Sequence, residues 1–411
     1  MNQELLKKYA EFAVKVAVNV QKDQTFMISS VIETAYFARM CAEIAYECGA
    51  RDVIMLYVDE QFNRLRMTHA SQEVLEDIKP WIVDRYMNYY TGEGSVSILH
   101  IFARDPEIYL GLDLLKTEKA SQAMNKATLP WQELVMTGKV QWSILSIPSE
   151  AWAKKVFPDC EIEQAVQKLW DAIFTASRVK GGDPVGEWRD QNKIMQQSRD
   201  KLNEMDLVSL HLTASNGTDL EVGLADTHMF AGGSQINGKG VEFFPNIPTE
   251  EVFTAPHARK VNGIVKSSMP YVYNGNLIEG ITAKFVDGLA VEYSAEVGNE
   301  LLKAMLSSDE GAKRLGEIAL VPASSPIKQA GILFYNTLFD ENAACHIAFG
   351  EGYPESIKGG EAMTREQRDE LGLNYSLIHE DIMIGTPDMN ITGTTRDGKT
   401  VEIFKDGNWA I

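Results

Sequence analysis

The stretch TFMISSVIETAYFARMCAEIAYECGARDVIMLYV, residues 25–58, decides the fold that we expect for the first half of the chain. Thr25–Ser30 and Val53–Val58 are short apolar runs of strand length. Between them, Thr34–Glu47 is amphipathic with a helical period, and Gly49 lies just past its end. Because glycine commonly follows the last turn of a helix, the stretch predicts a strand, a helix and a second strand.

The same alternation continues more loosely along the first half. Strand-like runs recur at Val96–Phe102 and Gln141–Ile147, and a helical pattern follows at Glu161–Ser177. Strands interleaved with helices predict a parallel or mixed sheet covered by helices on both faces. The turn after the first strand contains no glycine, which argues against a dinucleotide site, because glycine lets the backbone approach a pyrophosphate closely.

Turn signals distinguish the second half from the first. Asn-Gly and Asp-Gly pairs favour the positive φ angles of tight hairpin turns, and all of them follow residue 200. We therefore expect mainly antiparallel sheet, with strands such as Leu207–Thr213, Ile281–Phe285 and Val401–Phe404 and a helix at Asn299–Ser307. The pairs begin at Asn216, Asn237, Asn262, Asn274, Asp287, Asp397 and Asp406.

The length of 411 residues favours two domains over one core. We predict an α/β N-terminal domain over residues 1–182, with a mainly parallel or mixed sheet. A β-rich α+β C-terminal domain over residues 183–411 is expected to carry the functional site. Glu187–Met205 reads as a polar helix that joins the two halves.

The composition limits the classes of partner that we expect for this chain. The chain has 58 acidic and 39 basic residues and a net charge of −19, which argues against nucleic acid and anionic membranes, since both need a local excess of cations. No run approaches the roughly 18 apolar residues of a membrane span, and no apolar segment of signal-peptide length follows the N-terminus. The four cysteines lack C-x-x-C spacing, as is typical of reduced thiols, so we expect a cytoplasmic protein.

Acids and histidines gather in one window near the C-terminal end. It holds two of only seven histidines in the chain. Burying such a mixture costs free energy unless a cation neutralises it, and imidazole with carboxylate suits zinc, manganese, cobalt or iron. The window therefore predicts half of a metal site, and its members are Glu341, Cys345, His346, Tyr353, His379 and Asp381.

Each histidine in the window has two interpretations. His379 and Asp381 lie in a strand-like run, where residues two apart share a face, so they are either two metal ligands or a buried ion pair. His346 lies among small residues in an apolar run, as a ligand or as a satisfied core residue. Glu341 is five positions earlier and needs a bend or bulge to join His346.

Two further carboxylates stand in conspicuous settings. Glu251 lies among three prolines that exclude a regular helix, and a stiff loop carries a ligand well. Its neighbour Glu250 is expected to point at solvent. Glu317 begins an apolar strand after a helical segment, where a glutamate is either a ligand or a solvated edge residue.

Four motifs in order, PNIPTEEVFTAP from Pro245, GEIALVP from Gly316, DENAACHIAFGEGY from Asp340 and HED from His379, resemble the aminopeptidase T and aminopeptidase S family of metallopeptidases. The resemblance extends along nearly the whole chain. It implies a cytoplasmic homodimer that removes N-terminal residues from peptides with a free N-terminus, and an N-terminal half that shapes access to the site. It also implies two divalent metal ions (zinc, cobalt or manganese), with Glu317 bridging them and Tyr353 beside the reacting carbonyl. The implied ligands are Glu251, Glu317, Glu341, His346, His379 and Asp381.

The physical chemistry of these residues agrees with a two-metal hydrolase. Four carboxylates and two neutral imidazoles balance the four charges of two divalent cations, which can activate a bridging water. Tyr353 could donate a hydrogen bond to the developing oxyanion, or be a packed aromatic at a strand end. The chain contains no H-E-x-x-H helix and no G-x-S-x-G elbow. The alternatives are a metal-dependent amidase or deacetylase of a small molecule, and a non-enzymatic protein with a structural cation.

Overall fold

The computed structural model describes residues 2–273 and 275–411. The described chain separates into two compact units. The first comprises the residues up to Arg189 together with Ser234–Pro248, and the second comprises Asp190–Gly233 with Thr249–Ile411. The segment Ser234–Pro248 thus packs with the first unit, although it lies within the range that the sequence assigns to the second domain. That two domains meet after residue 182 stays a prediction.

The first unit is built on a four-stranded parallel sheet with the strand order β2-β1-β3-β4. The prediction of a parallel sheet is confirmed, and each strand begins and ends within a residue or so of the expected range. The strands are β1 (Thr25–Val31), β2 (Asp52–Val58), β3 (Val96–Phe102) and β4 (Gln141–Ser146).

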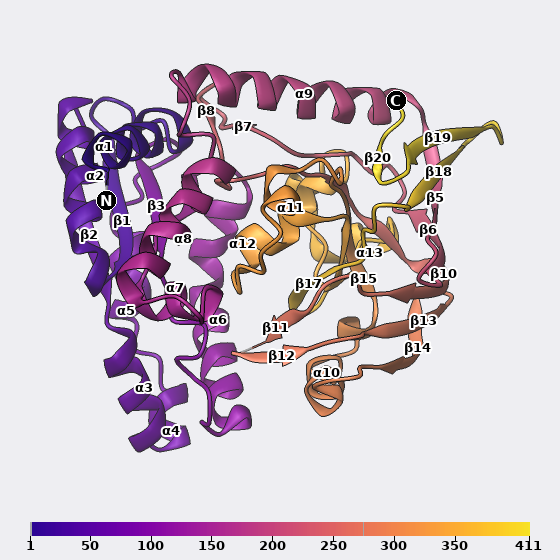
Figure 1. Ribbon diagram of the computed structural model, residues 1–411, viewed down its shortest axis with the longest axis horizontal. Helices are drawn as coiled ribbons and strands as arrows, with labels where there is room; N and C mark the ends of the chain where they lie inside the picture. The colour runs from indigo at the N-terminus through magenta and orange to yellow at the C-terminus, as the bar shows by residue number, and fades with distance from the viewer. Residues whose placement is uncertain (1, 274) are drawn as a thin grey trace. The chain divides into compact units, whose positions relative to one another are not determined.

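Helices cover both faces of this sheet, as Figure 1 shows for the indigo to magenta part of the chain. The chain steps from β1 to β2 in one direction and from β2 to β3 in the other, so right-handed crossovers place their helices on opposite faces. On one face, Met27 and Ile98 pack with Trp131 of α6 in a single apolar cluster. Tyr9, Phe37 and Phe174 pack together where α1, α2 and α8 meet. The helices are α1 (Gln3–Phe12), α2 (Ala35–Glu47), α3 (Glu60–His69), α4 (Gln72–Glu76), α5 (Trp81–Met87), α6 (Leu114–Met136), α7 (Glu150–Val156) and α8 (Ile162–Ala176).

A large antiparallel sheet of eight strands dominates the second unit, with the order β14-β13-β10-β6-β5-β18-β19-β20. The prediction of mainly antiparallel sheet in this half is confirmed. The strands are β5 (Leu207–Thr213), β6 (Asp219–Leu224), β10 (Pro256–Lys266), β13 (Thr282–Val286), β14 (Leu289–Ser294), β18 (Asn390–Thr395), β19 (Thr400–Lys405) and β20 (Asn408–Trp409).

The Asn-Gly and Asp-Gly pairs mostly join neighbouring strands, but the prediction is wrong at Asn262. Asn262 and Gly263 lie inside β10. Gly263 has a φ of +117°, and a β-carbon there would lie 2.2 Å from the carbonyl oxygen of Asp219, so glycine serves the close approach of β6 rather than a turn. Asn274 lies outside the described residues. The pairs at Asn216, Asn237, Asp287, Asp397 and Asp406 lie between consecutive strands.

A smaller antiparallel sheet with the order β17-β16-β15-β9 packs against the large one. Its inward face contributes Ile318, Ile347 and Phe349 to the apolar core, and the ring of Phe349 stacks on Phe285 of β13. The four strands are β9 (Val252–Thr254), β15 (Leu315–Leu320), β16 (His346–Gly350) and β17 (His379–Met383).

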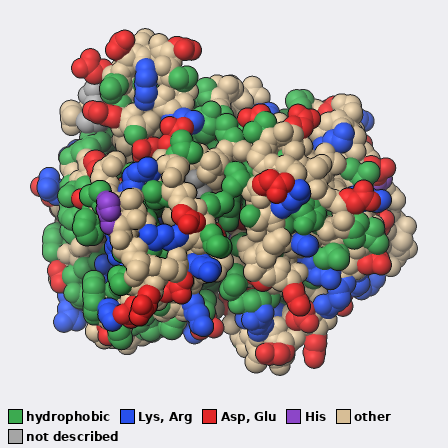
Figure 2. All heavy atoms as spheres, turned by 90° about the horizontal axis from the view of Figure 1, so that it is seen from below, with side chains coloured by type: hydrophobic (Ala, Val, Ile, Leu, Met, Phe, Trp, Pro, Cys, Tyr) green, Lys and Arg blue, Asp and Glu red, His purple; other side chains and the backbone are tan. Residues whose placement is uncertain are grey.

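Two hairpins and further helices complete the fold. None of the helices within residues 2–273 and 275–411 combines the length and the apolar character needed to cross a bilayer. Figure 2 shows acidic and basic side chains interspersed over the face that it draws. The remaining elements are the hairpins β7–β8 (Gln235–Ile236, Glu242–Phe243) and β11–β12 (Tyr271–Tyr273, Asn276–Ile278), and the helices α9 (Pro184–Glu204), α10 (Asn299–Met305), α11 (Pro326–Ala330), α12 (Thr337–Asp340) and α13 (Arg365–Glu370).

Candidate metal centre

The candidate site lies on the second face of the small sheet, opposite the apolar core. Residues that pair directly across antiparallel strands share a face, and residues two apart along a strand share it too. The register pairs Ala319 with His346, Ala348 with Asp381 and Gly350 with His379. The two alanines and the glycine are small, so they leave space on this face for the longer acidic and imidazole side chains.

Glu317 reaches this face because of a bulge. Leu315 pairs with Phe349, whereas Glu317 pairs with Ala348, so one extra residue, Gly316, is inserted into β15. In a regular strand Leu315 and Glu317 would point the same way, and Glu317 would face the apolar core with Leu315. The bulge instead sends Leu315 into the core and Glu317 to the polar face.

The structure brings five of the six predicted ligands together in two overlapping groups. Glu251, Glu317 and His346 form the first, and Glu317, His379 and Asp381 the second, each with one ligand atom per residue within 4.8 Å of the others. Nε2 of His346 lies 3.2 Å from a Glu251 oxygen and 3.3 Å from Oε1 of Glu317. Nε2 of His379 lies 3.3 Å from Oδ1 of Asp381 and 3.9 Å from Oε2 of Glu317. The two oxygens of Glu317 therefore face different histidines.

Backbone carbonyls set the tautomer of both histidines. Nδ1 of His346 lies 3.2 Å from the carbonyl oxygen of Ala344, and Nδ1 of His379 lies 2.8 Å from that of Glu351. A carbonyl oxygen can only accept, so Nδ1 carries the proton in each ring. Nε2 is left to face the carboxylates, which is the arrangement that holds a metal-binding imidazole in place.

The buried charges call for a cation. Oε2 of Glu251 and Oδ1 of Asp381 are fully buried, and each faces only an imidazole Nε2, that of His346 at 3.2 Å and that of His379 at 3.3 Å, without a well-aligned hydrogen bond. Burial, together with the charge of Glu251, raises the pKa of Glu317. Burial alone would lower the pKa of His379, but Asp381 and Glu317 raise it to about 10. Such a cluster of partly unsatisfied carboxylates and imidazoles fits divalent metal binding by its donor types.

Glu341 stands beside these groups and not within them. It begins a short 3₁₀ turn, Glu341–Ala343, which supplies the bend that its position in the sequence required. Burial and the charges of Asp381 and Glu251 raise its pKa well above the usual value, so its carboxylate lies near theirs. The expectation that Glu250 points at solvent is wrong: its side chain is buried and accepts a hydrogen bond from Nε2 of Gln191 at 2.8 Å.

Two aromatic side chains flank the cluster. The ring of Tyr353 lies 4.5 Å from that of His379 and meets Phe253 edge to face at 6.1 Å. Burial and the neighbouring carboxylates, Glu317 foremost, raise the pKa of Tyr353 well above the usual value. Its hydroxyl therefore keeps its proton at neutral pH and can donate a hydrogen bond beside the cluster.

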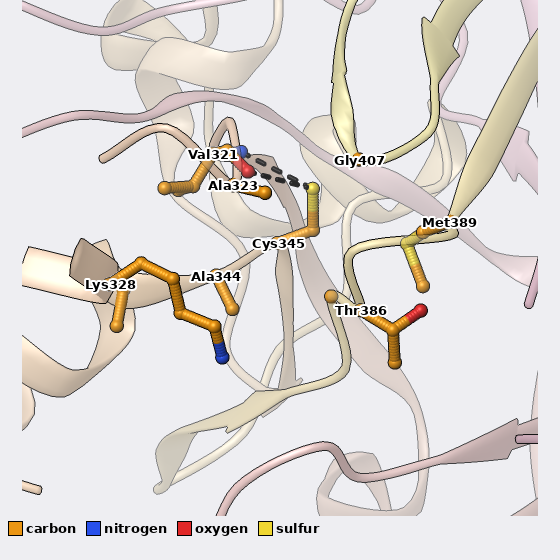
Figure 3. A pocket seen from close by; sticks show the side chains of 10 residues that line it. Val321, Ala323, Lys328, Ala344, Cys345, Thr386, Met389 and Gly407 are labelled. Atoms are coloured by element: carbon orange, nitrogen blue, oxygen red, sulfur yellow. Dashed lines mark hydrogen bonds between the residues drawn. The ribbon is translucent and has the colours of Figure 1, made fainter. Parts of the chain in front are cut away.

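Cys345 points away from the candidate ligands. Figure 3 shows its sulfur directed at the backbone of Val321, whose N–H donates to Sγ and whose carbonyl oxygen accepts from it, both at 3.3 Å. Burial raises the pKa of this thiol to about 11, so it is not a thiolate ligand. The small pocket in front of it, lined also by Lys328, Thr386 and Met389, is therefore separate from the acid cluster.

Comparison with known proteins now decides the family. Residues 2–409 match the family described as thermophilic metalloprotease (M29). The chain belongs to this M29 family. Aminopeptidase 2 of Geobacillus stearothermophilus is 43% identical over 98% of this chain and 97% of its own length. Aminopeptidase AmpS of Bacillus subtilis is 40% identical over 98% of each chain. The structure of wild-type AmpT from Thermus thermophilus superimposes over 100% of both chains with a TM-score of 0.91 at 39% identity.

The M29 match confirms the resemblance that the four motifs carry. Membership implies divalent metal ions, and the two acid and histidine groups at the small sheet are candidates to hold them. Sequence reasoning missed two residues that shape this site, Gly316 and Asn342. A glycine inside an apolar strand was the available signal for the bulge; nothing in the sequence pointed to Asn342, whose contacts are tertiary.

Proposed function

We propose that this M29 protein is a metal-dependent aminopeptidase that hydrolyses the N-terminal peptide bond of peptides with a free N-terminus, using a water activated between two metal ions. The observation that carries the two-metal proposal is the position of Glu317, which belongs to both three-residue groups and turns one oxygen toward each histidine. The proposed ligands, all in the C-terminal half, are Glu251, Glu317, Glu341, His346, His379 and Asp381.

Charge and donor type support this proposal. Four carboxylates and two neutral imidazoles supply four negative charges, which two divalent cations balance. Nitrogen and oxygen donors without a thiolate are typical of catalytic sites for zinc, cobalt or manganese. A structural zinc site, in contrast, commonly uses cysteine ligands. The sulfur of Cys345 is bonded to the backbone of Val321 and not directed at the candidate ligands, which also supports a catalytic site over a structural one.

The protein's own groups have distinct tasks in the proposed reaction. When bound, the metal ions supply hydroxide near neutral pH and polarise the scissile carbonyl. Glu317 holds the two halves of the cluster at a fixed spacing. Ala344 and Glu351 keep both imidazoles turned with Nε2 inward. Tyr353 donates a hydrogen bond to the carbonyl oxygen as negative charge develops on it.

A small-molecule amidase or deacetylase uses the same chemistry, but the M29 relatives named as aminopeptidases do not favour it. The test uses a leucine anilide and its N-acetylated twin as substrates. We expect turnover of the free amine alone, loss of activity in EDTA, and recovery on adding cobalt or zinc. Full activity in metal-free protein, or equal turnover of the blocked substrate, would refute the proposal. Elemental analysis should find two ions per chain.

The assembly and location are proposals of a different kind. The homodimer, the cytoplasmic location and the role of the N-terminal half in shaping access follow from the family resemblance. Gel filtration with light scattering at several protein concentrations tests the first. A mass that corresponds to one chain throughout would contradict it.

A further inference from the structure

Asn342 is a fully buried amide that contacts one candidate ligand, Glu341, and also the loop that carries another, Glu251. It has no exposed surface and lies in the 3₁₀ turn that begins with Glu341. Its Nδ2 donates to Oε1 of Glu341 at 3.3 Å and to the carbonyl oxygen of Leu338 at 3.0 Å. Its Oδ1 accepts from the backbone N–H of Glu250 at 2.7 Å.

These partners determine the orientation of the amide. The carbonyl oxygen of Leu338 can only accept and the N–H of Glu250 can only donate, so the amide cannot be flipped without losing both of these bonds. The turn itself is anchored, because Oγ of Ser325 donates to the carbonyl oxygen of Asn342 at 2.7 Å. Asn342 therefore links its own turn to a segment 92 residues earlier in the chain, a contact that no local sequence pattern indicates.

We propose that Asn342 is a positioning residue that holds the carboxylates of Glu341 and Glu251 at the spacing the metal centre requires. Glu341 is held directly, through its Oε1. Glu251 is held through the peptide N–H of its neighbour Glu250, at the point where the chain enters β9. Because buried carboxylates repel one another, they need such external holders to converge on a cation. This inference rests on the proposed function of the same site.

The test replaces Asn342 by alanine in the full-length protein, with Asn203→Ala as the matched control. Like Asn342, Asn203 uses both ends of its amide to hold backbone: Nδ2 donates to the carbonyl oxygen of Phe230 at 3.0 Å and Oδ1 accepts from its N–H at 2.8 Å. Asn203 touches no candidate ligand. Zinc affinity is measured on metal-free protein by competition with a chromophoric chelator. Thermal unfolding of the metal-free protein and the absorption spectrum of the cobalt form are recorded beside it.

We expect N342A to bind zinc about 10–100-fold more weakly and to alter the cobalt spectrum. N203A should lower only the unfolding temperature. A zinc affinity of N342A equal to that of wild type, whatever its unfolding temperature, would overturn the inference and leave the proposed function standing. Asn342→Ser removes less volume and serves if N342A does not fold; failure of both to fold would make Asn342 a folding residue and also overturn the inference. Wild-type protein that binds none of zinc, cobalt and manganese would overturn the proposed function itself.

Discussion

A β-carbon at Gly316 would lie 2.0 Å from the carbonyl oxygen of Glu351. The same oxygen accepts the Nδ1 proton of His379 at 2.8 Å. The bulge that turns Glu317 toward the polar face thus packs directly on the group that orients His379. Two candidate ligands on strands β15 and β17, which are not neighbours in the sheet, depend on one close backbone contact that only glycine permits.

Gly316→Ala should therefore damage both fold and site. The methyl group must displace backbone rather than a flexible side chain, so we expect a loss of about 1–3 kcal/mol of unfolding free energy in the metal-free protein and weaker zinc binding. Gly182→Ala is the control, because a β-carbon there meets nothing within 4 Å. Urea unfolding and chelator competition measure the two effects. Wild-type zinc affinity in G316A would show that the contact does not orient His379.

Glu317→Gln should abolish most activity without unfolding the protein. The amide keeps the shape but removes the charge that faces both histidines, and we expect activity to fall at least about 100-fold. The metal-free variant should be no less stable than wild type, since one of several repelling buried carboxylates is gone. Circular-dichroism melts and anilide hydrolysis check both statements. A variant that is destabilised yet active would assign Glu317 to structure.

Tyr353→Phe tests the hydrogen-bond donor. The ring can keep its packing on His379 and Phe253, so the change removes only the hydroxyl. If the hydroxyl stabilises the developing oxyanion, kcat should fall about 10²–10³-fold while KM and metal content change little. A fall in metal content would instead place the hydroxyl at the ligands. Steady-state kinetics and elemental analysis of the same preparation separate the two outcomes.

His100 in β3 should make the first unit sensitive to acid. Burial, with a smaller effect of Arg104, lowers its pKa from 6.5 to about 4. Between these values the unfolded chain binds a proton that the folded chain rejects, so stability is full near pH 7 and is lost as the pH falls toward 4. The loss is at most about 3 kcal/mol for this shift. Urea unfolding of wild type and His100→Gln at pH 7 and 4.5 should show a smaller drop in the variant; equal drops would contradict the assignment.

Much of the architecture follows from local patterns. Apolar runs predicted β1 and β2 with α2 between them, and Asn-Gly or Asp-Gly pairs marked five of the turns between strands. Alternation alone placed His379 and Asp381 on one face of a strand, as the structure has them. These features depend on residues within a few positions of one another, where helix and strand periods operate.

Sequence by itself determined which chemistry the chain can perform. The residue types fix which ligand atoms and charges are available, and the motifs identify the M29 family. Only the tertiary structure decided how the candidate ligand side chains come together in space. Gly316 shifts the register so that Glu317 leaves the core face, the 3₁₀ turn at Glu341 bends its carboxylate toward Asp381, and Asn342 joins segments 92 residues apart. Glu250, which the sequence could not tell from a solvated acid, is buried. Such features arise from strand pairing and burial between distant segments, and no local period encodes those contacts.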